Sequence, residues 1–310
     1  MSRVLVTGAS GFIGRAVITA FATDGYALRA AVRSPPQPPF GTGVEVIRHP
    51  DLAQPIDWGP LLAGMDAVIH LAGIAHTGRG VGPDRYDRVN RLATEQAAQA
   101  AARAGVRRFV FVSSIRAQCG PAAASVLTER DPALPSDDYG RSKLAAEAAV
   151  RGSDVAYTIL RPVLLYGPGA KGNFAALVRA ASSPWPLPAR QFTNRRSLLG
   201  IANFISALSF VLATPDAAGE TYVVADPGAP PSLAELIATL RQAQGRRPLL
   251  LPLPTSLVEL PLRILGRGDL WQRLGGNLRV APDKLIAAGW RPPHDTRSGL
   301  AAMVRSPPRA

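Results

Sequence analysis

The chain contains a single cysteine, Cys119, so no disulfide can form within it and a cysteine-based zinc site is excluded. Charged residues are scarce, at 18% of 310 residues, while 47% are apolar, a composition typical of a globular protein rather than a disordered one. The N-terminus lacks a basic segment followed by an apolar one, the mark of a secretory signal. We therefore expect a cytoplasmic protein.

Long apolar runs are also missing, and no segment reaches the roughly 18 apolar residues of a membrane span. The nearest is the segment of residues 248–265, which Pro252, Pro254 and Pro261 interrupt. We expect no membrane span and a short buried or interfacial helix in the second half of this segment. Attachment to a membrane surface through that helix stays open.

Lysine is rare, at Lys143, Lys171 and Lys284, although basic residues outnumber acidic ones by 35 to 22 and the net charge is +13. The arginines are scattered singly or in pairs, without the aromatic-interleaved basic patch of nucleic-acid-binding proteins. We expect no nucleic-acid partner. The surplus charge fits a solvated arginine-rich surface or a pocket for a phosphorylated substrate.

Short apolar segments alternate with helical patterns in the first half of the chain. Strands are expected at residues 3–7, 27–32, 67–71, 109–112 and 156–160, and helices at 12–23, 84–104 and 138–150. Strands buried on both faces and separated by helices predict an α/β fold with a doubly wound parallel sheet of the Rossmann type. We place this domain at residues 1–168.

The pattern loosens after residue 168, with helices expected at 174–181 and 201–212. Ser232 and Glu235 form a capping box for a helix that ends at Gln242. We expect residues 169–310 to form mainly a smaller α/β substrate-binding domain, with residues 201–226 rejoining the first domain.

Three glycines lie three residues apart between the first strand and the first helix. Gly8 permits a tight turn, Gly11 lets the backbone approach a pyrophosphate, and Gly14 lets the helix pack closely. The spacing predicts a dinucleotide site. The residues we expect at the cofactor from this turn and the following strand ends are Gly8, Ser10, Gly11, Phe12, Ile13, Gly14, Asp51, Leu52, Leu71, Ala72 and Gly73.

Arg33 ends the second strand, where an acidic residue would accept the ribose hydroxyls of NAD. Arginine suits the 2′-phosphate of NADP, so NADP(H) is favoured and NAD(H) is the alternative. A surface arginine ahead of the proline-rich loop is the other interpretation. The histidines show no ligand spacing, so we expect no metal site, and His70 is interpreted as a core histidine.

Tyr139 and Lys143 lie four residues apart at the start of an expected helix, so both side chains emerge on one face. An adjacent ammonium favours the phenolate, which should bring the tyrosine pKa down from its usual value of about 10. The pair predicts acid–base chemistry, although a core tyrosine with a solvated lysine is a common chance match.

The order of VLVTGASGFIG, VIHLAG, FVFVSS, YGRSK, LRPVLLYGPG and LIAAGWRPP resembles the extended short-chain dehydrogenases/reductases, in the NAD-dependent epimerase/dehydratase branch, over nearly the whole chain. The resemblance implies that Ser114 hydrogen-bonds the reacting oxygen and Tyr139 transfers the proton. Lys143 would hold the nicotinamide ribose, Asn90 would order the site, and Pro162 would lie against the nicotinamide.

The same resemblance implies a nucleotide-activated sugar as substrate and a homodimer formed through residues 84–104 and 138–150. Arg196 matches a diphosphate-binding arginine, and Lys171 and Asn173 lie in the loop that borders the diphosphate. Solvated surface charges are the other interpretation of Arg196 and Lys171.

The dehydratases of this family carry two carboxylates after the active-site hydroxyl, whereas Ile115 and Arg116 follow Ser114 here, which disfavours dehydration. Related 4-epimerases carry an acidic residue in place of Arg33 and an asparagine near Leu164. We therefore expect an NADPH-dependent reductase acting at C4 of a UDP-linked 4-keto hexose. The alternatives are a UDP-hexose or UDP-N-acetylhexosamine 4-epimerase with tightly bound NAD, a reductase of non-sugar carbonyls, and a non-catalytic dinucleotide-binding scaffold.

Overall fold

The computed structural model describes residues 2–75, 80–170, 173–264 and 275–305. The chain divides into two compact units, each made of segments that are distant in sequence. The first comprises Met1–Cys119, Pro132–Pro162 and Ala207–Tyr222, and the second comprises Gly120–Asp131, Val163–Ser206 and Val223–Ala310. Compared with the expected division after residue 168, the second unit begins at residue 163 and also takes residues 120–131. The returning segment is 207–222 rather than 201–226.

A sheet of seven strands forms the centre of the first unit, in the order β10-β7-β5-β4-β1-β2-β3. The strands are β1 (Arg3–Thr7), β2 (Ala27–Val32), β3 (Val44–Arg48), β4 (Ala67–His70), β5 (Arg108–Val112), β7 (Tyr157–Pro162) and β10 (Glu220–Val224). From β3 to β7 each strand pairs in parallel with its neighbour. The predicted Rossmann-type fold is confirmed.

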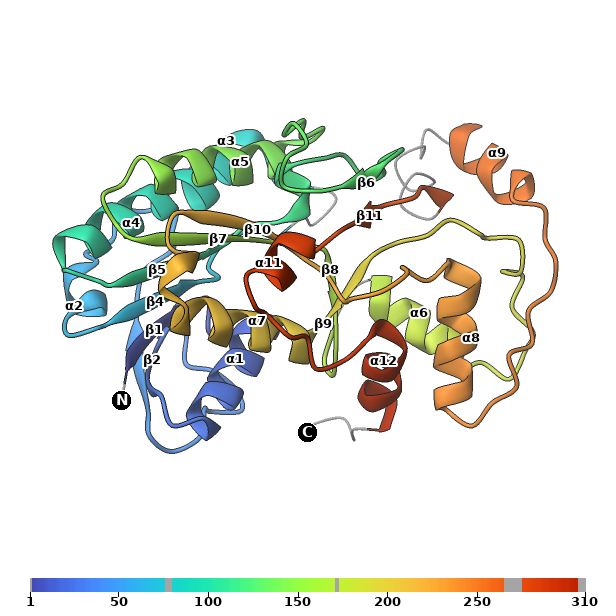
Figure 1. Cartoon of the computed structure of the whole chain (residues 1–310), viewed down its shortest axis with the longest axis horizontal. Coiled ribbons are helices and arrows are strands. Elements are labelled where there is room, and N and C mark those ends of the chain that lie inside the picture. The colour runs from blue at the N-terminus through green and yellow to red at the C-terminus, as the bar shows by residue number, and fades with distance from the viewer. Residues whose placement is uncertain (1, 76–79, 171–172, 265–274, 306–310) are drawn as a thin grey trace. The chain divides into compact units, whose positions relative to one another are not determined.

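Helices cover both faces of this sheet (Figure 1). On one face lies α1 (Phe12–Thr23), and on the other lie α4 (Ala93–Arg103) and α5 (Asp138–Arg151). The buried residues of α4 include Ala93, Ala97, Ala98 and Ala101. Such small side chains let the helix axis approach the sheet, where large strand residues fill the space between the layers. The carboxyl ends of the parallel strands form the edge at which such folds bind ligands.

The helix expected over residues 84–104 consists of three pieces. α3 (Pro83–Tyr86) leads into a π-helical segment, η1 (Asp87–Leu92), and then into α4. The wider turn of a π-helix accommodates an extra residue, commonly at a functional site. Here the segment contains Asn90, which is buried and makes contacts described below.

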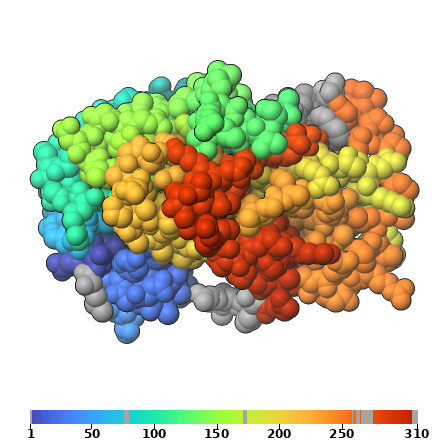
Figure 2. Space-filling model, in the orientation of Figure 1, coloured from blue at the N-terminus to red at the C-terminus, as the bar shows by residue number. Residues whose placement is uncertain are grey.

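Three helices pack around a small core in the second unit: α6 (Asn173–Ala181), α8 (Leu233–Ala243) and α12 (Thr296–Arg305). Figure 2 shows α12, in red, on the surface beside the orange α8. Two strand pairs complete the unit, β8 (Leu164–Tyr166) with β9 (Leu198–Gly200) and β6 (Val126–Leu127) with β11 (Arg279–Val280). The predicted capping box of Ser232 and Glu235 begins α8 and is confirmed.

The remaining helices are α2 (Gly59–Leu62), α7 (Ile201–Ala213), α9 (Ser256–Ile264) and α11 (Asp283–Ala287). The helix α9 is the short helix expected in the second half of residues 248–265, whose last residue lies outside the described residues. Within the described ranges, every helix is too short or too polar to cross a bilayer.

Candidate active site

The glycine turn between β1 and α1 is tightly closed. Gly8 has a φ of +65°, and a Cβ on Gly14 would lie 2.3 Å from the carbonyl oxygen of Gly8. Gly11 is the N-cap residue of α1, and no side chain of the described residues caps the first turn. A cradle that excludes side chains and leaves helix amides uncapped fits a dinucleotide pyrophosphate.

Arg33 follows β2, and its guanidinium lies 3.6 Å from the carboxylate of Asp51. The same carboxylate lies 3.4 Å from Arg85, which precedes η1. Sequence reasoning missed Arg85, because residues from different strand ends meet only in the folded sheet. Both arginine side chains are exposed, at 68% and 57%, so both guanidinium groups can also contact an added anion.

The strand end of β4 lies beside the candidate catalytic residues. Asn90 accepts a hydrogen bond from the Ile74 amide at 2.8 Å and donates to the Ser142 hydroxyl at 3.0 Å. A Cβ on Gly73 would lie 2.9 Å from Oδ1 of Asn90 and 3.8 Å from Nζ of Lys143. Asn90 therefore joins the loop after β4 to α5, as a residue that orders the site would do.

His70 is a core histidine with both ring nitrogens satisfied. Its Nδ1 lies 3.0 Å from the hydroxyl of Thr7 and its Nε2 lies 3.1 Å from the hydroxyl of Thr94. Burial lowers the pKa of His70 to about 3, so the ring is neutral. Among the described residues, no three or more His, Cys, Asp or Glu side chains gather as a metal site would require.

Ser114, Tyr139 and Lys143 come together in the first unit. Ser114 follows β5, and Tyr139 lies in the first turn of α5. The two side chains form a hydrogen bond. The centre of the Tyr139 ring lies 6.0 Å from that of the Tyr86 ring. The buried Nζ of Lys143 donates to the Val112 carbonyl at 2.9 Å.

The pKa values of this pair differ from the prediction. Burial raises the pKa of Tyr139, and the hydrogen bond with Ser114 opposes that effect. Burial lowers the pKa of Lys143 to about 8. The prediction that the ammonium brings the tyrosine pKa down is wrong here, because desolvation dominates and the ammonium is directed at Val112 and the Phe111 ring.

A buried charged network lies behind the catalytic residues and was missed from the sequence. Glu147, one turn after Lys143 on α5, is fully buried and accepts hydrogen bonds from Arg161 at 2.6 and 2.8 Å and from Ser113 at 2.6 Å. Arg161 also donates to Gln118 at 3.1 Å. This network connects α5 to the ends of β5 and β7. The last residue of β7 is Pro162, which is buried.

The candidate diphosphate residues lie in the second unit or outside the described residues. The Arg196 guanidinium donates to the carbonyls of Gly276 and Pro121 at 2.9 and 3.0 Å. Asn173 is the first residue of α6, and Lys171 lies outside the described residues. The neighbouring Arg195 forms an ion pair with Glu235 at 3.0 Å.

A doubly wound sheet with a glycine turn and a serine–tyrosine–lysine group defines a dinucleotide-dependent enzyme of the short-chain dehydrogenase/reductase class. The model of the NAD dependent epimerase/dehydratase family matches residues 4–225. The chain belongs to this family, and its cofactor is an NAD(P) dinucleotide.

Relatives and solved structures support this assignment. The chain is 33% identical to a UDP-glucose 4-epimerase of Vibrio cholerae, over 98% of the chain and 94% of that protein. It is 27% identical to a dTDP-6-deoxy-L-talose 4-dehydrogenase (NAD(P)(+)) of Kitasatospora kifunensis, over 97% of the chain and 94% of that protein. The structure of MoeE5 in complex with UDP-glucose and NAD matches with a TM-score of 0.75 at 26% identity, covering 98% and 97% of the two chains.

Proposed function

We propose that the protein is an NADP(H)-dependent reductase acting at C4 of a UDP-linked 4-keto hexose. The carrying observation is the hydrogen-bonded pair of Ser114 and Tyr139 on the turn and the helix that also position the buried Lys143. The two relatives described above are named for reactions at C4 of nucleotide-linked sugars. Their names support the position of the reaction on the sugar.

Reduction of a ketone produces an alkoxide oxygen that needs a proton. Tyr139 donates that proton, since its raised pKa keeps the phenol protonated at neutral pH. Ser114 binds the same oxygen through its hydroxyl. Lys143 would hold the nicotinamide ribose, and the bound nicotinamide would supply the hydride.

Arg33, Arg85 and Asp51 lie where we propose that the adenosine ribose of the cofactor binds, and their charges favour NADP(H) over NAD(H). Arg33 and Arg85 share the single carboxylate of Asp51, so this group carries a net positive charge. A 2′-phosphate would complete the pairing of the two guanidinium groups. In the second unit, Arg196 is the proposed partner of the substrate diphosphate, together with Lys171 and Asn173.

A 4-epimerase is the second candidate, favoured by the relative from Vibrio cholerae and by MoeE5, whose structure holds UDP-glucose and NAD. Such an enzyme uses Tyr139 first as base and then as acid, so the proposed site residues are the same. A dehydratase is disfavoured, because Arg116 follows the active-site hydroxyl and carries the opposite charge to a carboxylate.

The nucleotide that remains bound after purification separates the two candidates. We expect denatured protein to release less than stoichiometric NAD, and apo protein to bind NADPH more tightly than NADH. Arg33→Asp should abolish that preference. Arg103→Asp, which makes the same charge change at the end of α4, should leave it intact.

The substrate is tested with a UDP-4-keto-6-deoxyhexose and with UDP-glucose. NADPH consumption with the keto sugar supports the reductase. Stoichiometric NAD in the purified protein, together with interconversion of UDP-glucose and UDP-galactose, would replace the reductase with the epimerase.

A further inference from the structure

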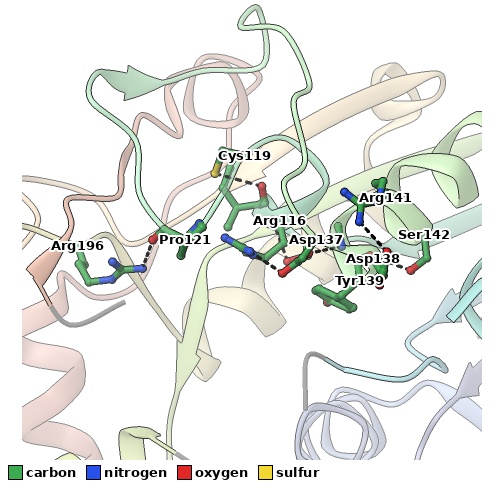
Figure 3. A network of polar contacts seen from close by, with 12 residues as sticks. Arg116, Cys119, Pro121, Asp137, Asp138, Tyr139, Arg141, Ser142 and Arg196 are labelled. Carbon is green, nitrogen blue, oxygen red and sulfur yellow. Dashed lines mark hydrogen bonds and ion pairs between the residues drawn. The ribbon is translucent and has the colours of Figure 1, made fainter. Parts of the chain in front are cut away.

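The turn that carries Ser114 is joined to the first turn of α5 by an ion pair. Arg116 lies in the short helix η2 (Ile115–Ala117), and its Nη2 is 2.6 Å from Oδ2 of Asp137. The other oxygen of Asp137 caps α5 by accepting the Gly140 amide at 2.8 Å. Figure 3 shows Arg116, Asp137 and Tyr139 grouped at this point.

The backbones of the two segments also touch. A Cβ on Gly140 would lie 2.3 Å from the carbonyl oxygen of Arg116, so only glycine fits there without displacement. The Arg116 amide donates to Oγ of Ser114 at 3.1 Å, and the Leu134 amide donates to the Gln118 carbonyl at 2.8 Å. These contacts fix the turn of Ser114 against the turn of Tyr139.

The guanidinium of Arg116 is directed to Asp137 and to no other carboxylate of the described residues. Its side chain is 15% exposed, and its Nη1 is buried without a hydrogen-bond partner among the described residues. Burying a cation with an unused hydrogen-bond donor costs free energy. We therefore infer that Arg116 serves the site through its charge rather than through the number of its hydrogen bonds.

The charged and titratable groups around Tyr139 come from three elements. Asp137 precedes it and raises its pKa, Tyr86 acts in the same direction from α3, and Arg116 acts in the opposite direction from η2. On α5 itself, Lys143 lies one turn on, and the exposed Asp138 and Arg141 pair with each other at 2.6 Å. Loss of Arg116 would remove the positive charge that pairs with Asp137, two residues from the tyrosine.

We propose that Arg116 is a positioning residue for proton transfer by Tyr139, which it serves by holding Asp137 and compensating its charge. The part of this inference that concerns proton transfer rests on the proposed function. The ion pair and its effect on the tyrosine do not depend on the identity of the substrate, so they can be tested without it.

The test follows the ionisation of Tyr139 in the full chain by NMR of ¹³Cζ-labelled tyrosine. The chain has six tyrosines, and Tyr139→Phe assigns the signal. Asp137→Asn keeps a capping oxygen and should lower the pKa of Tyr139, while Arg116→Met should raise it by a smaller amount. Arg116→Lys and the double variant Arg116→Met/Asp137→Asn should stay close to the wild type.

Equal Tyr139 titration in all of these variants would overturn the proposal, as would equal shifts in Arg116→Met and Arg116→Lys. If Arg116→Met does not fold, Asp137→Asn alone decides, since an unchanged pKa there contradicts charge compensation. Failure of the proposed function is distinguishable, because the wild type would then not reduce the keto sugar while the tyrosine shifts persisted.

Discussion

Tyr139 is the residue on which the proposed chemistry depends, and its hydroxyl can be removed without changing the packing of the ring against Tyr86. We expect Tyr139→Phe to lower kcat by about 10²–10⁴-fold, because the proton donor is lost, while dinucleotide affinity stays near the wild-type value. Steady-state rates with the keto sugar and NADPH titration measure the two effects. Tyr26→Phe, a change in a ring stacked on Phe21, is the control and should retain full activity.

Lys143 gives a prediction about stability and pH. Burial lowers its pKa to about 8 in the folded protein, against the usual value of 10.5 for a lysine. Between these two pH values the side chain is protonated in the unfolded chain and deprotonated in the folded one. Wild-type stability should therefore rise with pH across this window relative to Lys143→Met, by about 1–3 kcal/mol. Urea unfolding of both proteins at pH 7.5 and pH 10 measures the difference. A constant difference would contradict the lowered pKa.

The sequence indicated the spacing of the site residues but not their environments. Tyr139 and Lys143 could be predicted to share a helix face because side chains four apart do so. The direction of the tyrosine pKa shift could not, since it depends on how much solvent the folded chain excludes. Arg116 and Asp137 lie 21 positions apart, and no local pattern pairs them.

At the scale of elements, the turn from β1 to α1 depends on the absence of a side chain at Gly14. A Cβ there would lie 2.3 Å from the Gly8 carbonyl oxygen and 2.6 Å from the Ala9 Cα, both backbone atoms that cannot move aside cheaply. We expect Gly14→Ala to destabilise the fold by about 1–3 kcal/mol and to weaken dinucleotide binding at least tenfold. Thermal unfolding and NADPH titration are the measurements.

Gly41→Ala is the matched control, because nothing lies within 4 Å of the Cβ it would add. This variant should match the wild type in both measurements. If Gly14→Ala bound NADPH as tightly as the control does, close packing at the glycine turn would not be what shapes the cofactor site.

Helices with a strong apolar periodicity could be predicted well, but the π-helical segment within one of them could not. The helix Phe12–Thr23 has the predicted ends, since glycines precede it and its apolar spacing is regular. The helix expected over 84–104 contains the π-helical segment Asp87–Leu92, because Asn90 bonds to Ile74 and Ser142. Those partners are 16 and 52 positions away, beyond the reach of periodicity.

For the whole molecule, the resemblance to the family predicts a homodimer formed through residues 84–104 and 138–150. Light scattering should give twice the chain mass of 32.6 kDa. Ala148, an exposed residue of α5, would be covered in that dimer, so Ala148→Arg should shift the mass toward the monomer. Ala176→Arg, the same change on the exposed side of α6, should not. A wild-type mass of 32.6 kDa would contradict the expected dimer.

The segment of residues 207–222 returns to the first unit after the chain has entered the second. Because β10 pairs with β7, the ribosome must complete α6, β9 and α7 before the seventh strand emerges. During that interval the hydrogen-bonding groups along β7 are uncovered, and an unpaired strand edge invites pairing with other nascent chains. The risk of aggregation during synthesis is therefore greatest late, when most of the nucleotide-binding sheet has already left the ribosome.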